Sequence, residues 1–308
     1  MNKKLVYVDT DVGLGTPGAE IDDGAALLFL MHNPSIDIVG AGSVFGNVAL
    51  HDATINLDRL LTWLNGEHIP LGRGAQKPLI ADMTWFEGWQ AGYGETLPWK
   101  CRSIPILAAN LMIDAVRAHP GQVSILSLGP MTNLALAIRL DPAIVSLTRE
   151  VIVMGGSFNN QNSAPEFNVR CDPEAAQIVF SAGWDVHILG LDSTRRVHFS
   201  RGDFASLSDV NPAAAMLRAQ APGWIDRVEA MGWEQDGCAL HDAVAAACLA
   251  DETIFQVETM GVEIELADPN LRGLTRFFPE RETLSPVNVV TGLDHAKCRE
   301  LIWSHLEG

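Results

Sequence analysis

Apolar runs alternate with polar turns along the first two-thirds of the sequence, at two characteristic lengths. Short runs rich in Val, Ile and Leu predict strands, and the longer segments between them predict helices. The expected strands are 4–10, 36–44, 69–74, 122–129, 150–156 and 184–192, and the expected helices are 22–32, 51–66, 104–121, 131–140 and 172–183. Because the strands are continuous apolar runs, we expect a mostly parallel sheet with helices on both faces.

The last third of the sequence is more helical, with expected helices at 201–210, 211–237 and 241–251. Residues 255–266 and 285–294 indicate a β extension, and a final helix is expected from Asp294. No repeat, linker or low-complexity tract interrupts the sequence. We therefore expect one domain over 1–308, an α/β fold with an open, Rossmann-like central sheet and a more helical C-terminal part.

Composition narrows the classes of protein and partner. The formal net charge of −17 argues against nucleic acid as a partner, because phosphate backbones require clustered Lys and Arg. No apolar run is long enough for a membrane span, so we expect no membrane partner. The 5 cysteines are widely scattered without a C-x-x-C motif, which favours reduced thiols and a cytoplasmic location over a disulfide framework or a zinc site.

Polar residues follow the ends of several expected strands. "DTD" ends the first strand, "FGN" follows the second, and "LGPMTN" and "MGGSFNN" follow two later strands. In parallel α/β sheets, ligands bind outside the carboxyl ends of the strands. We therefore expect these segments to form one site.

Four aspartates surround the end of the first strand and the start of the first helix: Asp9, Asp11, Asp22 and Asp23. Asp9 and Asp11 lie two positions apart on an extended segment, so their side chains leave on the same side. Helix capping and a hydrogen-bonded turn would explain one or two of these acids. Several carboxylates beside a buried helix, however, repel one another unless they protonate or share a cation.

Two further segments add similar chemistry. His241 and Asp242 stand at the start of an Ala-rich helix, and Glu166 and Asn168 stand two apart on a stretch expected to be extended. Oxygen ligands of this kind suit Ca²⁺ or Mg²⁺ and not zinc. Each acid alone is equally well explained by a structural role, whereas the set favours a metal site.

Several ordered motifs resemble those of the inosine–uridine-preferring nucleoside hydrolases. They are "VYVDTDVG...IDDGAALLFL", "SVFGNV", "LSLGPMTNLALAI", "VIVMGGSF", "APEFNVRCDPEAAQIVF", "LGLDST" and "LHDAVAAACL". The resemblance implies the nucleoside hydrolase fold around a bound Ca²⁺ and hydrolysis of the N-glycosidic bond of ribonucleosides. It also implies a homodimer or homotetramer.

The same resemblance assigns roles by position. It implies that Asp11, Asp23, Asp242 and the carbonyl of Leu128 bind Ca²⁺, with Asp9 in support. Asp22 resembles the general base that takes a proton from a calcium-bound water, and His241 the histidine near the leaving base. The residues that resemble the ribose-binding set are Asn47, Met154, Asn160, Glu166 and Asn168.

Two segments depart from the usual pattern. An insertion, residues 14–20, separates Asp11 from Asp22, and we expect it to loop outward and leave the acids together. The segment 81–99 lacks the histidine that the family often shows near the base. Aromatic residues could stack on the base instead or merely anchor loops, and the candidates are Trp85, Trp89, Tyr93, Trp224 and Trp233.

Three alternative functions are weighed against this one. A phosphohydrolase of the haloacid-dehalogenase type would use D-x-D, but it needs a later lysine, and residues 105–192 contain none. A non-catalytic nucleoside-binding protein is disfavoured because Asp22 and His241 are both present. A hydrolase of another N-ribosyl compound, such as a nicotinamide or modified nucleoside, stays open because the base site is not readable.

Overall fold

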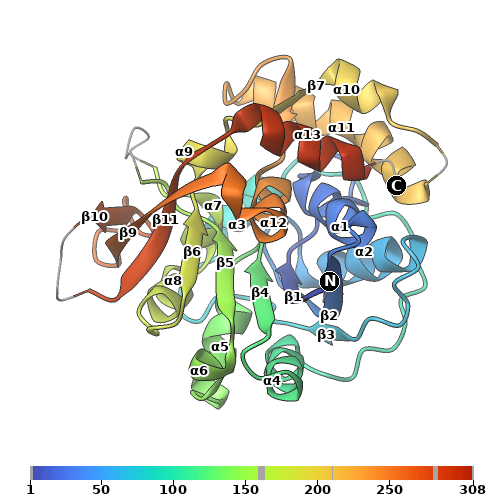
Figure 1. Cartoon of the computed structure of the whole chain (residues 1–308). Coiled ribbons are helices and arrows are strands. Elements are labelled where there is room, and N and C mark those ends of the chain that lie inside the picture. Colours follow the sequence, from blue (N-terminus) through green and yellow to red (C-terminus); the bar gives the residue numbers. More distant parts are fainter. Residues whose placement is uncertain (1–2, 159–163, 210, 280–283, 307–308) are drawn as a thin grey trace.

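A computed structural model describes residues 3–158, 164–209, 211–279 and 284–306. In these ranges nine strands form one sheet in the order β10-β9-β11-β6-β5-β4-β1-β2-β3 (Figure 1). The strands are β1 (Lys4–Thr10), β2 (Ile36–Ser43), β3 (Leu71–Arg73), β4 (Val123–Ser127), β5 (Glu150–Met154), β6 (Val186–Leu189), β9 (Phe255–Ile264), β10 (Thr275–Phe278) and β11 (Pro286–Leu293).

The neighbours from β3 through β11 pair in parallel, and β9 and β10 extend the edge in antiparallel fashion. The predicted open, mostly parallel α/β sheet and its β extension are therefore confirmed. From β1 the chain adds strands toward β3, and from β4 it adds strands the other way. This reversal makes the carboxyl ends of β1 and β4 the position where an open α/β sheet binds its ligand.

Helices cover both faces of the sheet. The longer ones are α1 (Asp22–His32), α2 (Leu50–Trp63), α4 (Ala108–Ala118), α5 (Thr132–Leu140), α8 (Pro173–Phe180), α11 (Pro212–Ala230), α12 (His241–Ala250) and α13 (His295–Leu306). The shorter ones are α3 (Thr84–Gln90), α6 (Ile144–Leu147), α7 (Phe167–Cys171), α9 (Leu191–Thr194), α10 (Arg201–Ser206) and a 3₁₀ turn at Glu252–Ile254. None of the helices in the described ranges is long and apolar enough to cross a membrane.

Successive residues of a strand supply the two apolar layers in turn. Val6 and Val8 of β1 belong to the apolar layer that includes residues of α1, α11, α12 and α13, whereas Tyr7 belongs to the layer that includes residues of α4, α5 and α8. This alternation follows from the two-residue period of side chains along a strand. Because helices cover both faces of the sheet, successive side chains of each strand are buried, and the strand sequences are continuous apolar runs.

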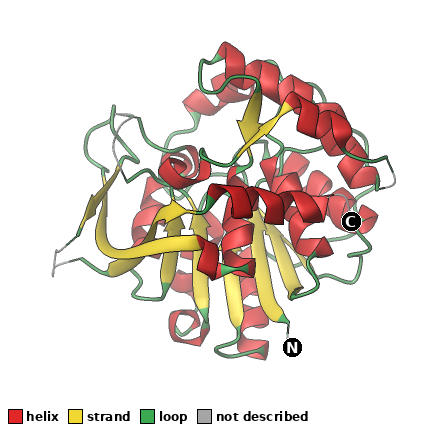
Figure 2. Cartoon of the chain, turned by 45° about the horizontal axis from the view of Figure 1, so that its top comes forward, coloured by secondary structure: helices red, strands yellow, loops and turns green. Residues whose placement is uncertain are grey.

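A small antiparallel sheet, β7 (His198–Ser200) with β8 (Gly237–Ala239), was not expected from the sequence. Figure 2 shows it apart from the large sheet, among the helices of the C-terminal part. β8 ends one residue before α12 begins, and α12 contacts β5 of the large sheet.

The insertion at 14–20 turns inward, so the expectation of an outward loop is wrong. Leu14 is 0% exposed, and the main-chain N–H of Gly15 donates to Gln220 Oε1 of α11 at 3.0 Å. Gly15 has a φ of +122°, and a Cβ there would collide with the side chains of Arg59 and Asn56 on α2. The loop is therefore packed between α2 and α11 as part of the core.

Candidate active site

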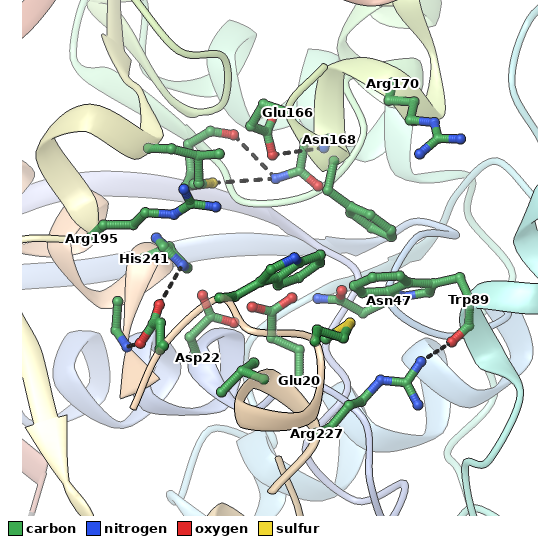
Figure 3. A pocket seen from close by; sticks show the side chains of 18 of the residues that line it. Glu20, Asp22, Asn47, Trp89, Glu166, Asn168, Arg170, Arg195, Arg227 and His241 are labelled. Atoms are coloured by element: carbon green, nitrogen blue, oxygen red, sulfur yellow. Dashed lines mark hydrogen bonds and ion pairs between the residues drawn. The ribbon is translucent and has the colours of Figure 1, made fainter. Parts of the chain in front are cut away.

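A cavity of about 820 Å³ lies at the carboxyl ends of the parallel strands, where α1 and α12 begin (Figure 3). It gathers most of the predicted site: Asp22, Asn47, Trp85, Trp89, Leu128, Met154, Glu166, Asn168, Trp224, Trp233, His241 and Asp242 line it. Asn160 lies outside the described residues. Segments spread from position 22 to position 242 thus meet at one place, as the strand-end argument predicts.

Three carboxylates meet where the two buried helices begin. Asp22, Asp23 and Asp242 each present an oxygen within 4.8 Å of the others, and all three are buried. Oδ1 of Asp22 accepts from the main-chain N–H of Asp23 at 3.1 Å, and its Oδ2 from that of Asp242 at 3.2 Å. The N-termini of α1 and α12 therefore favour negative charge at this position.

Asn47 links Asp11 to this group. Its main-chain N–H donates to Asp11 Oδ2 at 2.6 Å, and its side-chain amide donates to Asp23 Oδ2 at 3.1 Å. The other oxygen of Asp11, Oδ1, is buried without a hydrogen-bond partner among the described residues. A buried carboxylate oxygen left in this way requires a proton or a cation.

Gly46 explains how the backbone passes so close to Asp11. A Cβ at Gly46 would collide with Oδ2 of Asp11, and a Cβ at Gly129 would lie 2.8 Å from its Oδ1. Only glycine allows such a close approach of backbone to a carboxylate. The loops after β2 and β4 therefore enclose Asp11 tightly.

The buried acids of this group are Asp11, Asp22, Asp23 and Asp242, and their mutual repulsion opposes the ionisation of all four at once. Burial, and then repulsion by Asp23, raises the pKa of Asp22 to about 8. Burial raises the pKa of Asp23 to about 6, although Thr10 and Asn47 donate hydrogen bonds to it. Burial and neighbouring acids raise the pKa values of Asp11 and Asp242 well above the ordinary range. A divalent cation would remove this conflict, and the all-oxygen donor set fits a hard cation.

Asp9 lies beneath this group and outside the cavity. Its Oδ1 accepts from the side-chain amide of Asn133 at 2.9 Å, and burial raises its pKa to about 7. Asn133 also donates to the carbonyl of Ser43 at the end of β2. Asp9 thereby connects the ends of β1 and β2 to the start of α5.

Glu166 and Asn168 reach the cavity, but not from an extended segment as expected. Glu166 caps α7, and its carboxylate accepts from the main-chain N–H groups of Asn168 at 2.8 Å and Val169 at 3.1 Å. The amide nitrogen of Asn168 donates to the carbonyls of Leu128 at 2.8 Å and Met154 at 3.2 Å. These contacts direct the oxygen end of that amide away from both carbonyls.

His241 is held as a neutral imidazole. Its Nδ1 lies 2.7 Å from the hydroxyl of Thr194, and its Nε2 lies 4.0 Å from a carboxylate oxygen of Glu234. Burial, and then the charge of Arg195, lowers the pKa of His241 to about 3. Near neutral pH the ring is therefore uncharged.

Aromatic residues line the outer part of the cavity. Trp89 is stacked on Trp233 with ring centroids 5.8 Å apart, and it lies 4.6 Å from the ring of Phe167. Tyr93 does not line this cavity, so its predicted place there is wrong. Instead its ring centroid lies 4.8 Å from the guanidinium of Arg227, and it packs against the apolar cluster of Ala19, Val48 and Ala53.

The family model of the inosine-uridine preferring nucleoside hydrolases matches residues 6–300. The chain belongs to this family. It is 30% identical over 317 residues to the inosine-uridine preferring nucleoside hydrolase of Crithidia fasciculata, with 100% of this chain and 98% of that protein covered. It is 32% identical over 276 residues to uridine nucleosidase 1 of Arabidopsis thaliana, covering 85% of this chain and 80% of that protein.

A solved structure of a plant nucleoside hydrolase superposes on the chain with a TM-score of 0.84 at 28% identity, covering 99% of each chain. The family and fold that the motifs indicated are thus confirmed. The enzyme is a nucleoside hydrolase that acts on ribonucleosides.

Sequence analysis missed four groups at this nucleoside hydrolase site: Glu20, Thr10, Thr194 and Arg195. Glu20 lines the cavity beside Asp22, and burial, followed by repulsion from Asp22, raises its pKa well above the ordinary range. Thr10 donates a short hydrogen bond to Asp23. The position of Glu20 two residues before Asp22 is a signal that it lies near the site, but the expectation that the insertion loops outward excluded it.

Proposed function

We propose that Asp11, Asp23, Asp242 and the carbonyl of Leu128 bind Ca²⁺, and that Asp22 is the general base of ribonucleoside hydrolysis. The observation that carries this proposal is the buried cluster of Asp22, Asp23 and Asp242 within 4.8 Å, next to the unpartnered oxygen of Asp11. A mixed set of carboxylates and a main-chain carbonyl suits Ca²⁺, which takes more oxygen ligands than Mg²⁺ and tolerates irregular geometry. When bound, the ion would fix the sugar hydroxyls and increase the acidity of water beside them.

Asp22 is proposed to accept the proton of the attacking water. Its carboxylate lines the cavity, and two main-chain N–H groups fix its orientation. Those two hydrogen bonds also stabilise the ionised form that a base requires. Asn47, which contacts two of the other acids, lines the same part of the cavity.

Glu166, Asn168 and Met154 are proposed to hold the ribose. The glycosidic bond breaks through an oxocarbenium-like sugar, so positive charge develops on the ring. The carboxylate of Glu166 and the amide of Asn168 are buried and fixed by main-chain contacts before substrate arrives. Fixed oxygen atoms of this kind stabilise the developing charge without reorganising.

The base end of the substrate is proposed to lie by His241 and the tryptophans. A neutral imidazole held by Thr194 can position a leaving base through hydrogen bonds. Trp89 and Trp233 offer stacked ring faces at the rim of the cavity. Uridine and inosine are proposed as substrates because relatives at 30% to 32% identity carry those nucleosides in their names.

The decisive experiment measures ribose release from a panel of nucleosides after treatment with a chelator and after return of Ca²⁺ or Mg²⁺. The panel includes uridine, inosine, adenosine and nicotinamide riboside. We expect cleavage of uridine and inosine that is lost with the chelator and restored by Ca²⁺. The metal assignment would be overturned if the chelator-treated protein kept full activity and calorimetry showed no binding of added Ca²⁺.

A further inference from the structure

Arg195 places a positively charged side chain in the cavity beside His241. It follows α9 directly, is half-buried, and lines the cavity together with Leu191 (Figure 3). Among the described residues its guanidinium makes no hydrogen bond and no ion pair within 4.0 Å. Five N–H donors are therefore available to a molecule in the cavity.

The other two arginines of the cavity lie away from His241 (Figure 3). Arg170 lies over the ring of Trp85 at 4.3 Å. Arg227 donates to the main-chain carbonyls of Trp89 and Ala91. Of the three arginines that line the cavity, Arg195 is the one that stands beside His241 (Figure 3).

The location of Arg195 is fixed by its neighbour in the chain. Thr194 contacts Nδ1 of His241 at 2.7 Å, so the residue after Thr194 lies on the side of the cavity where His241 stands. Figure 3 shows Arg195 and His241 on the same wall, with Glu166 and Asn168 on the adjoining one. Glu234, whose carboxylate accepts from the N–H of Ala239 at 2.6 Å, attracts the guanidinium at longer range, but among the described residues no ion pair within 4.0 Å joins the two side chains.

We propose that Arg195 contacts the leaving base and that the enzyme thereby favours ribonucleosides whose bases carry carbonyl oxygens. This inference rests on the proposed function, which places the base beside His241. When the C1′–N bond breaks, its electron pair stays with the base, and the negative charge spreads onto the carbonyl oxygens of uracil or hypoxanthine. Water adds to C1′, its proton passes to Asp22, and the departing base then takes a proton from solvent.

A guanidinium suits this task for two physical reasons. It stays charged at every accessible pH, and its fork of parallel N–H groups matches oxygen acceptors. A fixed donor aimed at an oxygen that gains charge stabilises the transition state more than the ground state. Adenine presents an amino group at the corresponding position, which offers donors and not an acceptor.

The test compares Arg195→Met and Arg195→Lys with the wild type on uridine, inosine, adenosine and 4-nitrophenyl riboside. The nitrophenolate group leaves readily as an anion and needs little help from the protein. For Arg195→Met we expect kcat/KM to fall by about 10²- to 10³-fold on uridine and inosine. The loss on adenosine and on 4-nitrophenyl riboside should be severalfold or less, and Arg195→Lys should restore part of the lost activity.

The matched control is Arg196→Met, because Arg196 is exposed and does not line the cavity. It should leave all four rates unchanged. Activity of Arg195→Met on 4-nitrophenyl riboside shows that this variant is folded.

Equal losses on all four substrates, or no loss on uridine, would overturn the inference. Cleavage of uridine 5′-monophosphate that depends on Arg195 would also overturn it, since the guanidinium would then lie at the 5′ end. A wild type that cleaves none of the nucleosides would instead refute the proposed function itself.

Discussion

The main-chain N–H of Asp242 donates a hydrogen bond to Oδ2 of Asp22 at 3.2 Å, although 220 positions separate the two residues. The bond joins the first turns of α12 and α1, which also pack against each other along their buried faces. Because both helices direct main-chain N–H groups at the same carboxylate, the orientation of Asp22 depends on the placement of α12. One hydrogen bond therefore fixes the position of the proposed base, Asp22, relative to a proposed cation ligand, Asp242.

Replacement of Asp22 by asparagine should separate catalysis from cation binding. Asp22→Asn keeps the size and one of the two accepting oxygens but cannot take a proton, so we expect kcat to fall by about 10²- to 10⁴-fold. Calorimetry should show Ca²⁺ affinity largely retained, whereas Asp11→Asn should weaken both affinity and turnover. The exposed Asp114 of α4 provides the control, and Asp114→Asn should change neither. If Asp22→Asn lost Ca²⁺ as completely as Asp11→Asn, Asp22 would be a ligand and the base would have to be sought elsewhere.

The metal-free protein should become less stable as the pH rises from about 6.5 to about 8. The pKa of Asp22 is raised to about 8 and that of Asp9 to about 7, so the folded state binds more protons than the unfolded chain in this range. Stability contributed by these protonated acids is therefore lost with rising pH. His241 acts in the opposite direction, but only below about pH 6.5, the ordinary pKa of histidine.

Thermal unfolding midpoints, measured with chelator and with Ca²⁺, check this expectation. Ca²⁺ should raise the midpoint more at about pH 8 than at about pH 6.5, because it replaces the protons that the acids lose. A metal-free midpoint that increased across this range would contradict the assignment of a repulsive carboxylate cluster.

Gly46→Ala should weaken cation binding without touching a ligand. The new methyl group would collide with Oδ2 of Asp11, so the carboxylate or the loop after β2 must move. We expect a loss of about 1–3 kcal/mol in folding stability, typical of overpacking, together with reduced Ca²⁺ affinity. Gly223→Ala is the control, since a Cβ at Gly223 of α11 meets nothing within 4 Å. Unchanged affinity in Gly46→Ala would show that Asp11 does not need its present position.

Trp233→Ala distinguishes base stacking from loop anchoring. Trp233 is 49% exposed yet lines the cavity, so its removal should cost little stability. If it stacks on the base, KM for nucleosides should rise by up to about tenfold, in line with the energy of aromatic pairs. Steady-state kinetics on uridine and inosine give the answer, and unchanged KM values would leave Trp233 as a packing residue beside Trp89.

The sequence predicted the sheet and most of the acids because each depends on local signals. Apolar runs identify the buried strands, and Asp11, Asp22 and Asp242 stand at strand or helix ends where topology must bring them together. The prediction failed where the chain's path depends on distant partners. The insertion turns inward because Gly15 is hydrogen-bonded to Gln220, which lies 205 positions away. A local sequence pattern contains no information about such a contact.

The conformation around Glu166 was misread for a related reason. Alternate spacing places two side chains on one face of a strand, but Glu166 instead caps a five-residue helix through its own carboxylate. Side-chain to main-chain bonds of this kind compete with extended structure over distances of two or three residues. Likewise, no motif marked Arg195, because an arginine at the end of a short helix usually points to solvent.

The dispersal of the acidic cluster along the chain also bears on how the protein is assembled. Asp11 directly follows the first strand, whereas Asp242 lies at the start of α12, which is synthesised far later. In the proposed calcium site, high-affinity binding of the ion therefore cannot precede the docking of α12 onto α1. A luminescent lanthanide bound at the proposed calcium site should accordingly emit only from molecules in which α12 has docked, and it would thereby report the final stage of folding.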